Sequence, residues 1–434
     1  MKNYLSSALL PLFLLLCTCP DSYLGAQNPT PAPPQTTPFA VTNARVHVGD
    51  GTVLESATLL VSDGRIENVG PNLSVPAGYE TVDASGMDVY PGMIALNSQL
   101  GLTEIGAVRA TNDQREVGTF NPNARAVVAF NTDSQVIPTV RCRGVLLAQA
   151  TPEGTLVGGR SAIMQLDGWN FEDATVRADD GVHINWPNRN TYNWQTGDLL
   201  PNENYDEQVR ELEAFLEQAV GYCGRAEGEG ERLLKLEGFC DAVSGTARAY
   251  LHADEARNIQ AGVLLLKRMG ARPVVVGGYQ AHLVADFLKR EDVPVILGST
   301  QALPAAQDSP VDEPYHNPAL LAEAGVDFAI SHEGYWQQRN LPFVAGQAVA
   351  FGLPYEKAVE AVTLAAAKIV GIDEEYGSIA TGKSATFVIV DGDLLDMRRS
   401  NVEKAYIDGR DINLDNKQAE LYRKFREKYS RQSR

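Results

Sequence analysis

Polar side chains end two short apolar runs in the second half of the chain, and they are the residues best placed to do chemistry. His252 closes the run AYLHA, and His332 and Glu333 follow the run VDFAIS. Histidine titrates at a pH of about 6.5 and can act as a general base or a metal ligand, and an adjacent carboxylate can share either task. The alternative for each is a rim residue that hydrogen-bonds a neighbour and does no chemistry. We treat all three as candidate catalytic residues.

The runs that carry these residues alternate with helix-like segments, which predicts parallel strands joined by helices. The expected order is strand 249–253, helix 254–270, strand 272–278, helix 280–291, strand 293–298, strand 326–331 and helix 340–352. Polar residues recur at the carboxyl ends of these strands, where barrel enzymes place their chemistry. No glycine-rich phosphate-binding motif follows any of them, which counts against a nucleotide-binding sheet. We expect an α/β fold of the (β/α)8 TIM-barrel type.

Short β-like segments occur at both ends of the chain. FAVTNARVHVGDG and ATLLVSDGRIENVG near the start resemble GSIATGKSATFVIVDGD and KAYIDGRDI near the end in their alternating apolar residues and Gly-Asp or Asp-Gly turns. We expect these segments to form one split, small β-sandwich. The predicted organisation is a signal peptide (1–26), a Pro-rich linker (27–38), an N-terminal sandwich segment (39–90), the barrel (91–375), a C-terminal sandwich segment (376–413) and a basic C-terminal helix (414–434).

The first 26 residues predict export. Lys2 gives a basic start, residues 8–19 are mostly apolar, and Leu24-Gly25-Ala26 ends in small residues. An apolar run of this length is too short for a mature span across about 30 Å of hydrocarbon. We favour cleavage after Ala26 over lipidation at Cys17 or Cys19, because the residues before Cys17 are leucines. The mature protein is expected to be periplasmic or extracellular, and Cys223 and Cys240 can form a bridge there, although their separation alone does not establish one.

The charge balance limits the partners of the chain. Its 55 acidic and 37 basic residues give a net charge of −18, and a body this acidic repels nucleic acid. The tail from Lys417 is basic, and the i, i+4, i+8 spacing of Leu421, Phe425 and Tyr429 predicts a helix with one docked face rather than a membrane patch. No later segment predicts a membrane span. We expect a small-molecule or peptide-like substrate, and a homo-oligomer remains open.

A long polar segment follows the first expected barrel strand. Loops of this kind form substrate walls on barrel enzymes. Arg109, Arg115 and Arg125 can hold a substrate carboxylate there, or they can pair with Asp113 and Glu116 in a solvated lid. His183 falls in an expected loop and is left unassigned.

Three groups of segments together resemble the amidohydrolase superfamily, in particular its imidazolonepropionase-like and dipeptidase-like branches. DASGMDVYPGMI (83–94) is similar to the family's entry into barrel strand one, and LHAD (251–254) to its strand five. RNLP (339–342), AVTLAAAK (361–368), GSI (377–379) and TGKSA (381–385) are similar to its closing run. The resemblance spans nearly the whole mature chain. It implies a barrel with a split sandwich, and hydrolysis of non-peptide C–N bonds by metal-activated water.

The sequence departs from that family at the metal site. The family's His-x-His on strand one is replaced by Asn97 and Gln99, and Gln149 stands on the expected fourth strand in place of a bridging Lys or Glu. Amides are poor zinc ligands. We therefore expect no conventional two-metal site, and at most one divalent metal such as zinc, held by His252, His332 and Glu333. Asn97, Gln99, Arg109 and Gln149 are expected to bind substrate.

These observations leave three functions open. The leading one is an exported hydrolase that acts on a carbon–nitrogen bond other than a peptide bond, by water attack on a carbonyl. The rival from another class is a metal-depleted pseudoenzyme that binds a ligand or partner at the barrel mouth. The third is metal-free hydrolysis with His332 or Glu333 as the base, which would survive chelation.

Overall fold

The computed structural model describes residues 30–193, 195–225, 230–304 and 309–432. The predicted signal peptide and the first three residues of the predicted linker lie outside the described residues. Within the described residues, no helix is long and apolar enough to cross a membrane. Residues 30–38 do not behave as a free linker, because they pack onto the body: the Ala32 amide donates to Asp167 Oδ2, and the Gly64 amide donates to Gln35 Oε1.

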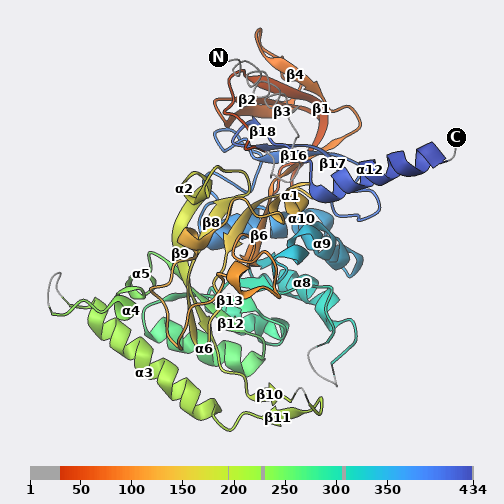
Figure 1. Cartoon of the computed structure of the whole chain (residues 1–434). Helices are drawn as coiled ribbons and strands as arrows, with labels where there is room; N and C mark the ends of the chain where they lie inside the picture. Colours follow the sequence, from red (N-terminus) through yellow and green to blue (C-terminus); the bar gives the residue numbers. More distant parts are fainter. Residues whose placement is uncertain (1–29, 194, 226–229, 305–308, 433–434) are drawn as a thin grey trace, which may run out of the picture.

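A small sheet at one end of the molecule combines strands from both ends of the chain (Figure 1). The central link is the antiparallel ladder that pairs Phe387 with Pro91 and Val390 with Asp88. The sheet order is β18-β17-β16-β5-β1-β2-β3, with β4 paired to β1. Its strands are β1 (Phe39–His47), β2 (Val53–Ser62), β3 (Arg65–Pro71), β4 (Glu80–Asp83), β5 (Asp88–Pro91), β16 (Phe387–Asp391), β17 (Asn401–Ile407) and β18 (Arg410–Asp411).

The second large sheet is a nearly closed barrel, whose order is β15-β14-β13-β12-β9-β8-β7-β6. The strands are β6 (Met93–Ser98), β7 (Val145–Ala150), β8 (Val157–Gln165), β9 (Thr175–Asn185), β12 (Arg248–Ala253), β13 (Arg272–Gly277), β14 (Val295–Leu297) and β15 (Phe328–Ile330). The Gln99 amide donates to the Gly334 carbonyl (3.2 Å), which ties the ends of β6 and β15. The predicted fold, a TIM-type barrel with a split small sandwich, is confirmed.

One strand breaks the regular barrel pattern. β8 runs antiparallel to both β7 and β9, whereas β9, β12, β13, β14 and β15 pair in parallel. β7 is therefore the second strand of the barrel, and β9 is the fourth. The prediction that Gln149 belongs to the fourth strand is wrong, because the chain returns through a hairpin after β7 instead of crossing over through a helix.

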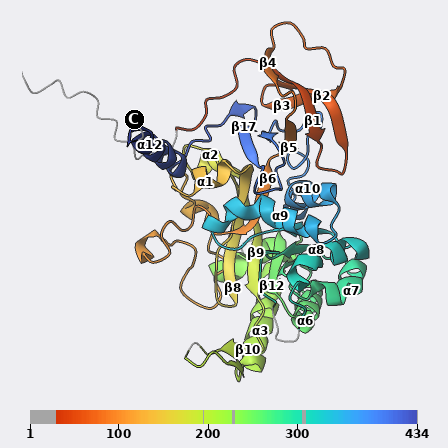
Figure 2. The ribbon, with the colours of Figure 1, turned by 90° about the vertical axis from the view of Figure 1, so that its right-hand side faces the viewer.

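Helices cover the barrel and follow the expected alternation in the second half of the chain (Figure 2). They are α1 (Ile137–Arg141), α2 (Phe171–Ala174), α3 (Tyr205–Cys223), α4 (Leu234–Glu237), α5 (Cys240–Val243), α6 (Ala256–Arg268), α7 (Ala285–Arg290), α8 (Glu313–Ala324), α9 (Leu341–Ala350), α10 (Tyr355–Val362), α11 (Leu364–Val370) and α12 (Lys417–Gln432), with 3-10 turns η1 (Arg109–Thr111), η2 (Ala126–Ala129), η3 (Ala281–Val284) and η4 (Trp336–Asn340). A short hairpin, β10 (Asn190–Tyr192) with β11 (Leu199–Pro201), precedes α3.

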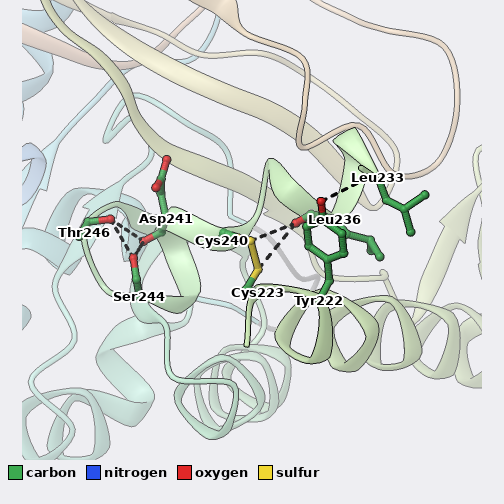
Figure 3. The surroundings of a disulfide bond; sticks show 8 residues. All are labelled: Tyr222, Cys223, Leu233, Leu236, Cys240, Asp241, Ser244 and Thr246. Atoms are coloured by element: carbon green, nitrogen blue, oxygen red, sulfur yellow. Dashed lines mark hydrogen bonds between the residues drawn. A yellow bond between two sulfur atoms is a disulfide. The ribbon is translucent and has the colours of Figure 1, made fainter. Parts of the chain in front are cut away.

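A disulfide joins Cys223, at the end of α3, to Cys240, at the start of α5 (Figure 3). Both sulfur atoms lie within 4 Å of the Leu236 carbonyl oxygen (3.9 and 3.8 Å). The bond closes a segment of 17 residues, which includes α4. The third cysteine of the described chain, Cys142, is free and half-buried.

The C-terminal helix α12 forms as predicted, but its apolar side is not docked. Leu421 and Phe425 are 38% and 46% exposed, and the helix projects from the body in both views (Figures 1 and 2). The predicted contact between this side and the rest of the same chain is therefore wrong.

Candidate active site

The carboxyl ends of β12, β13 and β15 bring the polar residues of the barrel mouth together. His252 is the second-last residue of β12, and Asp254 follows that strand directly. Glu333 lies three residues after β15, and its charge acts on both Asp254 and Tyr279. The two predicted candidates His252 and Glu333 therefore lie at one mouth, together with two residues that had no predicted role.

His252 is bound to a second histidine inside the barrel. Its Nε2 atom lies 2.8 Å from Nδ1 of His183, and Nε2 of His183 lies 2.8 Å from Oγ of Ser161. His183 is buried in β9 and stacks on the ring of Tyr250. Burial lowers the pKa of His252 to about 4 and holds the pKa of His183 well below its ordinary value, so both rings are neutral at pH 7.

The hydrogen bonds around Ser161 assign the tautomers of this pair. The Ser161 hydroxyl donates to the Gly181 carbonyl, and its oxygen accepts from Gln149 Nε2 (3.3 Å each). We assign the single Ser161 proton to the Gly181 carbonyl, and under this assignment the contact with His183 takes an N–H from His183 Nε2. Nδ1 of His183 then accepts from Nε2–H of His252. This leaves Nδ1 of His252 with a free lone pair.

A second buried network occupies the centre of the barrel. Tyr250 donates to Asp180 Oδ2 (2.5 Å), and Gln149 Nε2 donates to the same oxygen (2.9 Å). Gln149 Oε1 accepts a hydrogen bond from the backbone N–H of Asn97 (3.1 Å). Desolvation raises the pKa of the fully buried Asp180, which favours the neutral acid.

This network engages the side chain of one predicted substrate-binding residue, Gln149, and the backbone N–H of another, Asn97. Gln149 is fully buried and its side chain makes bonds at both ends, and Asn97 is 7% exposed. The structure therefore places Gln149 in the barrel core instead of a substrate pocket. Asn97 has φ +52°, a left-handed conformation that asparagine tolerates better than most residues, at the point where β6 turns into the loop.

Asp254 is the residue of the mouth whose acidity is tuned for chemistry near neutral pH. Desolvation, with the charge of Glu333 in addition, raises its pKa to about 6. Its surface is nevertheless open to water. The two observations agree if the carboxyl lies in a concave mouth, where water reaches it but protein surrounds it. A carboxyl of this pKa can both take up and release a proton at neutral pH.

Gly277 makes room for this carboxyl. A Cβ at that position would lie 2.4 Å from Asp254 Oδ1, and the glycine has φ +92°. The next turn of the chain supplies the Tyr279 amide, 3.5 Å from the same oxygen. Desolvation and the charge of Glu333 raise the pKa of Tyr279 to about 12, so its phenol stays protonated and can donate a hydrogen bond.

A cavity of about 10 Å³ lies beside Tyr279, between the ends of β13 and β14, with room for about one water molecule. Asn317 lines it, and its Oδ1 atom is buried without a hydrogen-bond partner in the described chain. An acceptor of this kind fits a bound water. The cavity is lined by Gly277, Tyr279, Leu297, Gly298, Ser299, Thr300, Pro314, Asn317 and Pro318.

The remaining predicted residues lie around the rim. His332 is half-buried, its Nδ1 lies 3.2 Å from the Glu333 carbonyl, and desolvation lowers its pKa. Gln99 is half-buried at the seam of the barrel, and Arg109 is exposed in η1. Arg115 and Arg125 pair with Glu153 (3.2 Å) and Asp179 (2.7 Å), so both are engaged in ion pairs within the chain, although with other carboxylates than expected.

Comparison with known proteins agrees with this architecture. The family model described as "Amidohydrolase family" matches residues 283–417. An imidazolonepropionase of Mesorhizobium japonicum is 25% identical over 78% of this chain and 87% of its own length. An amidohydrolase of Thermotoga maritima, solved by crystallography, has a TM-score of 0.74 at 23% identity and covers 86% of this chain and 99% of its own. Residues 283–417 thus match the amidohydrolase family, and the chain as a whole is similar to members of that superfamily in sequence and in fold.

A solved prolidase with bound N-methylphosphonate-L-proline is also similar, with a TM-score of 0.55, 15% identity, and coverage of 87% of this chain and 100% of its own. This likeness concerns the fold.

Amidohydrolases usually bind divalent metal ions, and the donors of this barrel do not fit such a centre. Both polar side-chain atoms of Gln149 already form hydrogen bonds, and Nε2 of His252 is hydrogen-bonded to His183. Among the residues that the structure describes, no three or more His, Cys, Asp or Glu side chains are grouped so as to hold a metal. The predicted ligand set of His252, His332 and Glu333 is therefore not brought together as a metal site in the described part of the chain.

Two residues of this barrel mouth are missed by sequence reasoning. It places His183 in a loop, whereas the residue is buried on the fourth barrel strand. The alternating run VHIN ahead of Trp186 is a usable signal for a strand. The sequence analysis also assigns Asp254 only to the start of the following helix. Because Asp254 lies two residues after His252, at the end of the same strand, it falls at the barrel mouth as well.

Proposed function

We propose that this protein is an exported hydrolase that cleaves a carbon–nitrogen bond other than an ordinary peptide bond, in a small or peptide-like substrate. The names of its relatives support this class of bond: an imidazolonepropionase and a prolidase are among the similar proteins. The observation that carries the proposal is Asp254, an open carboxyl at the barrel mouth with a pKa of about 6.

Asp254 acts as the proton carrier of the reaction. As a carboxylate it takes a proton from a water molecule, whose oxygen forms a bond with the carbonyl carbon of the substrate. The C–N bond then breaks, and the same carboxyl returns the proton to the departing nitrogen. This sequence needs a group that is deprotonated before the attack and protonated after it, which a pKa near the working pH allows.

Two neighbouring groups orient the substrate. The protonated phenol of Tyr279 donates a hydrogen bond, a role that suits an oxygen with developing negative charge. Nδ1 of His252 carries a free lone pair and accepts a hydrogen bond from an N–H of the substrate. Its low pKa of about 4 keeps this nitrogen unprotonated throughout the neutral range.

The experiment compares hydrolysis by three proteins. A panel of dipeptides that end in proline and of small cyclic amides is incubated with the wild-type protein, Asp254→Asn and Asp292→Asn, and the products are followed by mass spectrometry. Asp292→Asn is the matched control, because Asp292 is an exposed aspartate before β14, outside the mouth. We expect the rate of hydrolysis by Asp254→Asn to be at least about 100-fold lower than that of the wild type, because the general base is removed. Full activity in Asp254→Asn would refute the assignment.

The pseudoenzyme remains the second candidate function, and one observation favours it. Polar groups at the barrel centre, among them Gln149 and Asp180, are bonded to one another, and only Asp180 Oδ1 of this pair lacks a partner among the described residues. A pseudoenzyme would bind compounds of the same panel without turnover, which calorimetry distinguishes from hydrolysis.

Export is included in the proposal. The Cys223–Cys240 disulfide supports it, because such bonds persist in oxidising compartments outside the cytoplasm. The N-terminus of the protein recovered from its host tests it: a start at Gln27 is expected, and an intact Met1 would overturn it.

A further inference from the structure

Helix α12 presents an apolar side that the rest of its own chain does not cover. Leu421, Tyr422, Phe425 and Tyr429 lie at i, i+1, i+4 and i+8 and are 38%, 65%, 46% and 60% exposed. They form one stripe on a helix of 16 residues, a length that is marginal in water without packing. We call these four residues the apolar stripe.

The helix is also strongly basic. It holds six Lys and Arg residues and two Glu residues, in a chain whose net charge is −18. Lys424 and Lys428 form no ion pair with the described residues, and neither does Arg426. Arg426 and Lys428 lie over the rings of Tyr422 and Phe425, and a surface complementary to the stripe and these cations is acidic and partly apolar.

Such a surface exists at the far end of the molecule. The open side of α3 carries Asp206, Glu207, Glu211 and Glu217, all exposed, together with one exposed basic residue, Arg210. The β10–β11 hairpin just before this helix exposes Leu199 (65%) and Leu200 (46%). We call the four acidic residues and these two leucines the acidic face. An isolated two-stranded hairpin is marginally stable in water, so it too gains from being covered.

The two surfaces cannot meet within one chain. α3 and α12 lie at opposite ends of the molecule in both views (Figures 1 and 2). Asp415, just before α12, accepts two bonds from Arg423 within the same tail (3.0 and 2.6 Å).

We propose that α12 docks on the acidic face of a second copy of this chain. Two molecules in antiparallel orientation would exchange the contact reciprocally, so both helices and both acidic faces are covered and the assembly closes as a two-fold dimer. Opposite charge steers the pairing, and burial of the apolar stripe against one of the two leucines stabilises it, because Leu199 and Leu200 are consecutive strand residues that point to opposite sides of the hairpin. An anionic membrane suits the pair less well, because the acidic body repels it.

Charge exchange tests this dimer. One variant carries Lys424→Glu, Arg426→Glu and Lys428→Glu, and the other carries Asp206→Lys, Glu207→Lys and Glu211→Lys. Each is measured alone by sedimentation equilibrium, in the form in which the protein is recovered from its host. We expect each to weaken the dimer at least about tenfold, because like charges then face each other in both contacts. An equimolar mixture should regain the dimer. In the mixed dimer, the reversed helix of one variant contacts the reversed face of the other, and the second contact keeps the wild-type charges.

A control variant reverses three exposed cations elsewhere, Lys289→Glu, Arg398→Glu and Arg399→Glu, and should dimerise as the wild type does. A wild-type protein that stays monomeric at all concentrations overturns the proposal. So does a dimer that neither charge-reversed variant weakens, or a failure of the mixture to recover. If α12 instead binds phosphatidylglycerol vesicles and no dimer forms, a lipid surface is the partner and the proposal is wrong.

Discussion

The Cβ atom that Gly277 lacks would lie 2.4 Å from Oδ1 of Asp254. The glycine at the end of β13 therefore leaves space for a carboxyl that follows the neighbouring strand, β12. This relationship explains how Asp254 can lie at the mouth with a raised pKa, enclosed by the turn that follows β13.

Replacement of Gly277 tests that explanation. Gly277→Ala must move Asp254 away, so hydrolysis should fall at least about tenfold, as expected when a proton carrier is misplaced by an ångström. The backbone at φ +92° adds a stability cost of about 1–3 kcal/mol, measurable by urea unfolding.

Gly78→Ala is the matched control, because Gly78 has φ +93° and a Cβ added there would have nothing within 4 Å. It should show the stability cost and keep its activity. Equal activity loss in both variants would mean that strain, and not the contact with Asp254, is responsible.

Asp180 should make the protein less stable as the pH rises. Burial raises its folded pKa above the ordinary value of 3.8, so the folded state binds the proton more tightly than the unfolded state. Its contribution is fully present below pH 3.8 and is lost as the pH rises through the folded pKa. Asp180→Asn keeps the group neutral, so its free energy of unfolding should exceed that of the wild type by an amount that grows from pH 4 to pH 7 in urea titrations. A constant difference across this range would contradict a neutral Asp180.

The tautomer of His252 can be observed directly. ¹⁵N NMR of histidine-labelled protein at pH 7 should show His252 protonated at Nε2 and bare at Nδ1, as the chain through His183 and Ser161 requires. Ser161→Ala removes the acceptor for His183 Nε2, so the pair should become a mixture of tautomers, whereas Ser161→Thr should preserve the wild-type pattern. The opposite tautomer in the wild type would refute the assigned role of His252.

The disulfide should stabilise the fold by about 3 kcal/mol, as a closed loop of 17 residues does. The double variant Cys223→Ser with Cys240→Ser should therefore unfold at a lower urea concentration. Cys142→Ser is the control, because that cysteine is free. Indistinguishable unfolding of the double variant and the wild type would show that the bond contributes nothing.

The sequence predicts most of the scaffold because the strands of the second half are short, apolar and bounded by clear helix signals. β12, α6 and β13 lie within a few residues of their predicted limits. The prediction fails at β8 and β9, because a hairpin inside a parallel barrel leaves no helix to mark the strand count. For this reason the sequence assigns Gln149 to the wrong strand, and His183 to a loop.

The site is harder to predict for a physical reason. The raised pKa of Asp254 comes from burial beside Gly277 of β13 and from the charge of Glu333 after β15, and no local pattern encodes that enclosure. The docked face predicted for α12 fails in the same way: the spacing of Leu421 and Phe425 predicts an apolar side, but not which molecule covers it.

The dependence of kcat/KM on pH tests the central claim most directly. With a substrate of the panel, kcat/KM of the wild type should rise about tenfold per pH unit below pH 6 and level off above it, since the carboxylate form of Asp254 is the active base. Asp254→Asn should lose this rise along with most of the activity, and Asp292→Asn should retain both. A rise through pH 6 that persists in Asp254→Asn, at undiminished rate, would contradict the account.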